Sequence, residues 1–220
     1  MTTTRLFRLI AITSLTLSLF WTSLAAASVN RSGSWYDPTH SGEGFILQFI
    51  DDSRAVIYWF TYDESGAQRW FTGVGQMNGN TLEVADLLVT EGGVFGPSFD
   101  PDNVVRIDVG TLNLLFDNDE TGTAQYTING VDGTQSIQRL TRPVEVASSA
   151  QFNVPRKSGS WYDPTRSGEG FVLEILPNGG QVAYWFTYGD DLDTSWYLAV
   201  GHVENEQVIM DLYTAYGVGF

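Results

Sequence analysis

Two pairs of carboxylates lie at matching positions in a motif that the sequence contains twice. Asp37 and Glu43 belong to WYDPTHSGEGF, and Asp163 and Glu169 belong to WYDPTRSGEGF. Paired carboxylates can hydrolyse glycosides when they face each other across a cleft at a defined separation. An Asp before proline more often begins a turn, however, and a Glu between two glycines is aimed by that turn. We therefore expect these four residues to form loops and polar ligand contacts, and we expect no enzymatic activity.

Aromatic residues are the second group that could bind a ligand. The six tryptophans after the first 27 residues fall at three matched positions: Trp35 with Trp161, Trp59 with Trp185, and Trp70 with Trp196. In VIYWFTY, the alternation of a strand puts Val56, Tyr58, Phe60 and Tyr62 on one face, and Ile57, Trp59 and Thr61 on the other. Both faces carry rings, so one of the two sets can be partly exposed.

Two roles remain open for these rings. They can form the core of a β domain, where large rings bury much apolar area. They can instead form a platform on which a sugar ring or another apolar ligand stacks. For the second role we expect Trp59, Tyr62 and Trp70 and, at the matching positions, Trp185, Tyr188 and Trp196.

Histidine and metal-binding patterns give little support for other chemistry. His40 is matched by Arg166, His202 is matched by Gln76, and the chain has no cysteine. A histidine-dependent triad or a zinc site would therefore depend on unmatched residues. The segment 117–122 begins like a calcium loop, but Ile128 stands where a bidentate Glu is needed. We expect neither a metal nor a cofactor.

The matched residues belong to a long duplication. Ser32 to Gly75 returns as Ser158 to Gly201 without a gap, an offset of 126 residues. A period of this length indicates duplicated domains rather than a solenoid. The second copy reaches only Phe220 and lacks a counterpart of residues 104–140. We expect an incomplete second domain, and two interpretations remain open: a truncated product, or a half-domain that needs a partner.

The hydrophobic pattern predicts an all-β protein. Apolar residues alternate with a period of two, and Asp, Asn and Gly turns separate the runs. We expect an antiparallel meander of about eight strands that closes into a small barrel or sandwich, duplicated, with the second copy incomplete. The predicted divisions are a signal peptide (1–27), a first β-repeat domain (32–143), a linker (144–157) and a second domain (158–220).

The N-terminal sequence indicates the compartment of the protein, and its net charge limits the partners that it can bind. Arg5 and Arg8, an apolar run and the small residues SLAAAS are typical of a secretory signal. We expect a secreted or periplasmic protein whose mature chain does not insert into a membrane. A formal net charge of −15 repels phosphate backbones, so nucleic acid is an unfavourable partner.

With WYDPxxSGEGF followed by YWFTYD, the chain resembles a group of tandem β repeats in exported bacterial proteins. The resemblance covers 32–143 and 158–220 and implies an accessory extracellular module without an established activity. Gly33 to Tyr36 is also similar to the first strand of avidin-type barrels. Asp37 and the Gly-Glu-Gly turn depart from that pattern, so biotin binding does not follow.

Two function hypotheses follow from these observations. The first is a non-catalytic exported protein that binds an extracellular or envelope ligand through its repeated aromatic residues. The ligand that we expect first is a glycan. Duplicated weak sites would raise its avidity. The second is a structural or interaction protein whose aromatics are core and whose incomplete second repeat mediates assembly by self-association.

Overall fold

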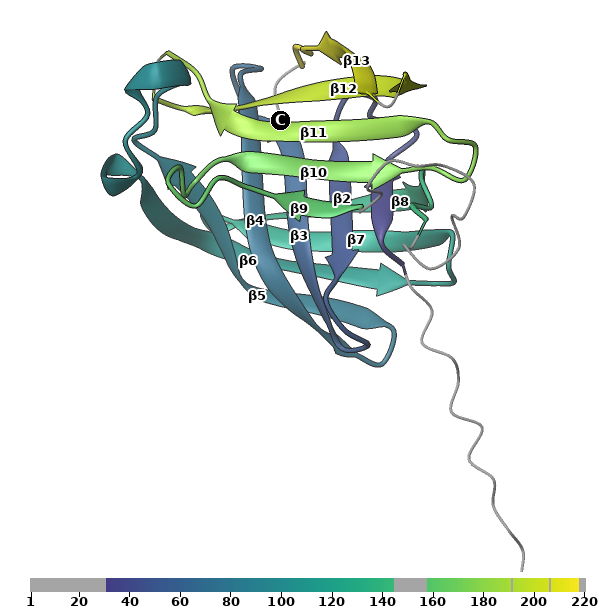
Figure 1. Ribbon diagram of the computed structural model, residues 1–220. Helices are drawn as coiled ribbons and strands as arrows, with labels where there is room; N and C mark the ends of the chain where they lie inside the picture. Colours follow the sequence, from purple (N-terminus) through teal and green to yellow (C-terminus); the bar gives the residue numbers. More distant parts are fainter. Residues whose placement is uncertain (1–30, 145–157, 191, 206, 218–220) are drawn as a thin grey trace, which may run out of the picture.

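The computed structural model describes residues 31–144, 158–190, 192–205 and 207–217 (Figure 1). Eight antiparallel strands form a closed barrel in chain order: β1 (Gly33–Tyr36), β2 (Gly44–Phe49), β3 (Arg54–Tyr62), β4 (Gln68–Asn78), β5 (Thr81–Glu91), β6 (Val105–Phe116), β7 (Thr121–Ile128) and β8 (Val131–Arg139). β1 pairs with both β2 and β8, which closes the sheet on itself. The predicted all-β meander is confirmed, and the first region closes as a barrel rather than a sandwich.

The remaining strands form an open antiparallel sheet. Its five strands are β9 (Gly159–Trp161), β10 (Gly170–Ile175), β11 (Gln181–Tyr188), β12 (Thr194–Glu204) and β13 (Gln207–Tyr213). They pair in chain order, with β9 and β13 at the two ends. In Figure 1 this sheet lies across the outside of the barrel, with its strands crossing β2, β3 and β4. These strands lie within residues 158–220, the range in which the sequence predicts a second domain.

The barrel interior is an apolar core made by every second residue of each strand. Its first members are the Trp35, Phe45, Leu47, Ile57, Trp59 and Phe71 side chains of β1 to β4. Side chains from the later strands complete it: Leu82, Val84, Leu112, Leu114, Phe116, Ala124 and Ile137. Trp35 and Trp59 are fully buried there. The rings fill the interior of a small barrel, which therefore is a packed core and not a channel.

A second apolar cluster holds the sheet on the barrel. It joins the outward side chains Ile46, Phe60, Tyr62 and Trp70 of the barrel to Val172, Tyr184, Phe186 and Trp196 of the sheet. The alternation predicted for residues 56–62 is thus observed, because Trp59 faces the barrel core while Phe60 and Tyr62 face the sheet. The second half of β3, from Trp59 to Tyr62, is therefore buried on both faces.

The connections follow the predicted turn chemistry. Residues 117–120 form the tip of the β6–β7 hairpin, where the Asp117 amide donates to the Thr121 carbonyl at 3.0 Å. Two short 3₁₀ helices, η1 (Gly96–Ser98) and η2 (Pro101–Asn103), lie between β5 and β6. None of the helices described is long and apolar enough to cross a membrane. The predicted signal peptide and nearly all of the predicted linker lie outside the described residues.

Candidate functional site

Residues at matched positions of the duplication contact each other reciprocally between the barrel and the sheet. The Trp70 indole N–H donates to the Thr187 carbonyl at 3.0 Å. At the matched positions, the Trp196 indole N–H donates to the Thr61 carbonyl at 3.4 Å. Trp70 packs edge-on against Phe186, with centroids 5.5 Å apart, and its counterpart Trp196 packs edge-on against Phe60 at 5.2 Å.

A second reciprocal set uses hydroxyl groups. The Tyr58 hydroxyl lies 3.0 Å from the Ser160 hydroxyl, and the Tyr184 hydroxyl lies 2.7 Å from the Ser34 hydroxyl. The offset of 126 residues relates Tyr58 to Tyr184 and Ser34 to Ser160. The two surfaces in contact are therefore related as those of an isologous dimer interface are, although both belong to one chain.

One of the polar positions at which the two halves of the interface differ is position 48, where Gln48 is matched by Glu174. Gln48 accepts a hydrogen bond from the Ser160 amide at 2.9 Å. The Glu174 carboxylate accepts from the Ser34 hydroxyl at 2.9 Å and from the Thr141 hydroxyl at 2.7 Å. Burial raises the pKa of Glu174 above its ordinary value, and these two hydrogen bonds offset only part of that effect.

The raised pKa of Glu174 makes the stability of the folded chain pH-dependent. The folded chain keeps a proton on this carboxyl at a pH where the unfolded chain has lost it. Stability from this group is therefore highest below its ordinary value of 4.5 and falls as the pH rises through the folded pKa. We expect Glu174→Gln to remove that loss, so that the variant gains stability relative to the parent between pH 4.5 and neutrality.

Urea denaturation of both proteins across that pH range measures the difference in unfolding free energy. The matched control is Gln48→Glu, which places a carboxyl at the equivalent position beside Ser160. A constant difference between parent and Glu174→Gln at every pH would show that Glu174 does not titrate differently in the folded chain.

The predicted carboxylates hold the two loops in the same way. Asp37 accepts from the Thr39 amide at 2.8 Å, and Asp163 accepts from the Thr165 amide at 2.8 Å. Burial favours the neutral form of Asp37, but hydrogen bonds from Thr39 and His40 hold its pKa below the usual value. Hydrogen bonds from Thr165 likewise lower the pKa of Asp163. Both Asp side chains act as turn caps, as the motif predicts.

Glu43 and Glu169 occupy equivalent places between a loop and a strand. Glu43 accepts from the Thr61 hydroxyl at 2.6 Å, and Glu169 accepts from the Thr187 hydroxyl at 2.7 Å. The preceding Gly42 has a φ of 102°, a backbone conformation that side-chain-bearing residues rarely adopt. Both glutamates are partly buried, and each reaches the mouth of a hollow.

Most of the rings predicted to stack on a ligand are buried. Trp59 is enclosed in the barrel core, and Trp70 and Trp196 are enclosed between the barrel and the sheet. Tyr62 and Tyr188 are buried as well, with hydroxyls that donate to the Gly42 and Gly168 carbonyls. These five rings are enclosed in the barrel core or by the packing of the sheet on the barrel, although Tyr62 and Trp70 each border a hollow. Of the six predicted stacking rings, only Trp185 is partly exposed.

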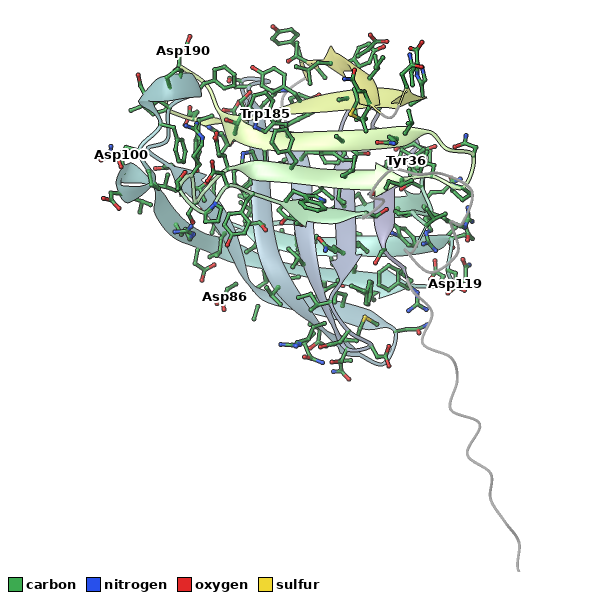
Figure 2. The ribbon with its side chains drawn as sticks, viewed as in Figure 1. Tyr36, Asp86, Asp100, Asp119, Trp185 and Asp190 are labelled. Atoms are coloured by element: carbon green, nitrogen blue, oxygen red, sulfur yellow. The ribbon has the colours of Figure 1, made fainter. Side chains whose placement is uncertain are left out.

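Exposed rings gather instead on the face of the second sheet that is turned away from the barrel. Trp161 is 49% exposed and Phe171 is 44% exposed. Phe171 stacks on Trp185 with centroids 5.2 Å apart, and Trp185 packs on Tyr197 at 5.7 Å. Figure 2 shows Trp185 on this outer face of β11. Phe95, from the segment between β5 and η1, packs on Trp185 at 5.3 Å. We call these five rings the open aromatic face.

A hollow of about 650 Å³ lies beside the open aromatic face. Its lining includes Phe95, Trp161, Phe171 and Trp185, together with the charged side chains Asp163, Arg166 and Glu169. Three of the predicted ligand contacts, Asp163, Glu169 and Trp185, are therefore brought together here. In the first repeat the matching residues Trp59 and Asp37 are buried, and Glu43 lines a hollow together with Tyr62.

Arg166 sets the electrostatics of this hollow. Its Nε donates to Glu169 at 2.6 Å, and its Nη2 donates to the Gly96 carbonyl at 3.0 Å. The guanidinium also lies 4.5 Å from the centre of the Phe99 ring. Arg166 neutralises Glu169 and leaves Asp163, exposed, as the acidic side chain at the rim.

Phe95, Phe171 and Tyr197 were not among the predicted contacts. A signal for two of them exists, since Phe171 and Tyr197 match Phe45 and Phe71 of the barrel core.

No protein-family model, curated protein or solved structure matches the chain. Within the described ranges, no group of three His, Asp or Glu side chains could hold a metal ion.

Proposed function

We propose that this protein is a non-catalytic interaction protein that assembles through the open aromatic face of its second repeat. One observation carries the proposal. Trp161, Phe171, Trp185 and Tyr197 match Trp35, Phe45, Trp59 and Phe71, which form the barrel core. In the barrel, β5 to β8 cover the first set of rings. The matching rings of the second sheet have no such cover among the strands described. A contiguous group of exposed aromatic rings such as this one marks an interaction surface.

The strands at the ends of the second sheet support the same function. β9 pairs only with β10, and β13 pairs only with β12, among the strands described. β13 also exposes several apolar side chains: Val208, Ile209, Leu212 and Tyr213. Open edges with apolar side chains accept another strand by β-augmentation.

A second copy of this chain is the partner that fits best. It brings both an apolar face and open strand edges, so two sheets can cover each other about a two-fold axis. Within one chain, the two repeats already contact each other in this reciprocal way at the interface between barrel and sheet. The expected secretion or periplasmic location would place both copies in the same compartment.

The carboxylates support a non-catalytic role. Asp37 and Asp163 cap turns, while Glu43 and Glu169 accept hydrogen bonds from threonine hydroxyls. Each of the four therefore has a structural partner. The two histidines occupy unmatched positions of the duplication.

Analytical ultracentrifugation over a range of concentrations tests the assembly. We expect the parent to form dimers, and we expect the double variant Trp161→Ser, Phe171→Ser to raise the dissociation constant at least about tenfold. Ile50→Ser is the matched control, because Ile50 is similarly exposed on the β2–β3 turn, away from this face. A parent that stays monomeric at every concentration would refute the proposal.

Glycan binding is a second candidate function for the same face. The hollow beside it combines stacking rings with the exposed carboxylate of Asp163, which is the arrangement that holds a sugar ring and its hydroxyls. A glycan array distinguishes the candidates. Binding by monomeric protein that is lost in Asp163→Asn would support a glycan, whereas assembly should not respond to that substitution.

A further inference from the structure

The first repeat carries a different concave region, at the end of the barrel where β3, β5 and β7 finish. Two hollows lie there, of about 430 and 610 Å³, and both are lined by Thr61 and Tyr62. Strand ends and the loop 39–43 surround them, and Gly217, which follows β13, also lines the smaller hollow. We call this region the barrel mouth. It is separate from the open aromatic face, since the residues lining it do not include any of those five rings.

One wall of the barrel mouth is apolar. It is built from the side chains Phe71, Val89, Ile107, Val109, Ile128 and Val131. Ile107 is 37% exposed and Val131 is 63% exposed, so this wall is accessible from solvent. Below it, Phe71 and Tyr126 pack on Trp59 with centroids 5.5 and 4.8 Å away, which closes the floor. A floored, apolar recess at the end of a small barrel is a frequent place for ligands.

The barrel mouth also carries polar and acidic side chains. Glu43, Asp63, Glu64 and Glu91 line the two hollows, with His40 at the edge. Arg69 lies among them, but it is shared between Asp63 at 3.2 Å and Asp193 at 2.8 Å. The acidic side chains therefore outnumber the cations, and the local field favours a positively charged ligand.

A buried hydrogen-bond donor also faces no acceptor in this region. The Nε2 atom of Gln135 is buried and has no hydrogen-bond partner among the described residues, and Gln135 lines the smaller hollow. A buried donor without a partner costs free energy, so an acceptor atom that enters this hollow, from a ligand or from water, would gain a hydrogen bond.

We propose that the barrel mouth of the first repeat binds a small amphiphilic amine. The alkyl part of the ligand packs on the wall formed by Ile107, Val109 and Ile128. Its ammonium group lies beside Glu91, which lines the same hollow as that wall, and an acceptor oxygen that reaches the adjoining hollow takes the hydrogen bond from Gln135. This site does not depend on the assembly of the second repeat.

A displacement titration with two probes of equal chain length tests the site. The protein is first loaded with the neutral fluorophore N-phenyl-1-naphthylamine, and decylammonium or decanoate is then added. We expect decylammonium to displace the fluorophore at a concentration at least about tenfold lower than decanoate needs. Equal displacement by both probes, or no displacement by decylammonium, would overturn the proposal.

Substitutions locate the binding. Ile107→Lys places a cation in the apolar wall at an exposed position, so we expect it to weaken decylammonium binding at least about tenfold. Val131→Lys serves as a second variant at a more exposed position, where folding is not at risk. Glu91→Gln should reduce the preference for the cationic probe over the anionic one, because Glu91 lines the same hollow as the apolar wall.

The open aromatic face is the competing site for any apolar probe. The double variant Trp161→Ser, Phe171→Ser is therefore the control, and we expect it to bind decylammonium as the parent does. Loss of binding in this control, with full binding in both lysine variants, would assign the probe to the second repeat and refute the barrel-mouth site.

Discussion

Replacing Trp196 with alanine should detach the second sheet from the barrel while the barrel stays folded. The Trp196 ring is 3% exposed, packs on Phe60 and Tyr62, and donates from its indole to the Thr61 carbonyl. Removing a buried tryptophan costs about 3–5 kcal/mol. The barrel core is a separate cluster that contains none of these residues, so it should keep its own stability.

Hydrogen exchange resolves this outcome strand by strand. We expect backbone amides of β11 and β12 to lose protection in Trp196→Ala, while those of β6 and β7 keep it. Tyr197→Ala is the matched control, since Tyr197 is the next residue of β12 and belongs to the open aromatic face. Equal loss of protection throughout the barrel would show instead that barrel and sheet unfold as one unit.

The matched pair Trp59→Ala and Trp185→Ala should give very different losses of stability. Trp59 is fully buried and contacts Phe45, Phe71 and Tyr126 in the barrel core. We expect its removal to lower the free energy of unfolding by about 3–5 kcal/mol. Trp185 occupies the same position of the repeat, but it is partly exposed on the second sheet. Its removal should cost about 1 kcal/mol in the monomer.

Chemical denaturation of the two variants at low protein concentration measures the difference. Low concentration matters, because assembly through the open aromatic face would add stability that depends on Trp185. Equal losses for the two variants in the monomer would mean that Trp185 is enclosed in solution, and that the face is not open.

Strand alternation was enough to predict an antiparallel all-β meander, but not whether it closes as a barrel or as a sandwich. Residues 56–62 carry aromatic rings on both faces of the strand, and the structure places Trp59 in the core and Phe60 against the second sheet. The loops followed from local chemistry, because Asp37 and Asp163 cap the turns that their prolines favour. These features depend on residues close in sequence, so the sequence pattern contains them.

The exposure of individual rings could not be predicted in the same way. Trp59 and Trp185 have nearly identical neighbours in sequence, yet one is buried and the other partly exposed. The difference arises from β5 to β8, which close over the first ring and have no complete counterpart near the second. Likewise Trp70 is buried by Thr187 and Phe186, more than 100 residues away in the chain. Packing between distant segments leaves no local signal.

Phe95 illustrates the same limit for the candidate site. It belongs to the segment before η1 of the first repeat, but it packs on Trp185 and Tyr197 of the second sheet. Its sequence surroundings, GGVFGPSF, indicate only a turn. A residue that one repeat contributes to a hollow in the other can be found only from the folded chain.

The pairing of β1 with β8 determines when each part of this protein can form. Closure joins Trp35 to Arg139, so it must wait until that arginine has been synthesised, whereas each strand pair of the second sheet is local. Chains fold from the N-terminus as they are made. The finished barrel then presents the outward side chains Phe60 and Trp70, and the later strands pack against them. In a chain folded in this order the barrel-facing rings are already covered, and the outer side of the late sheet stays open for the assembly that we propose.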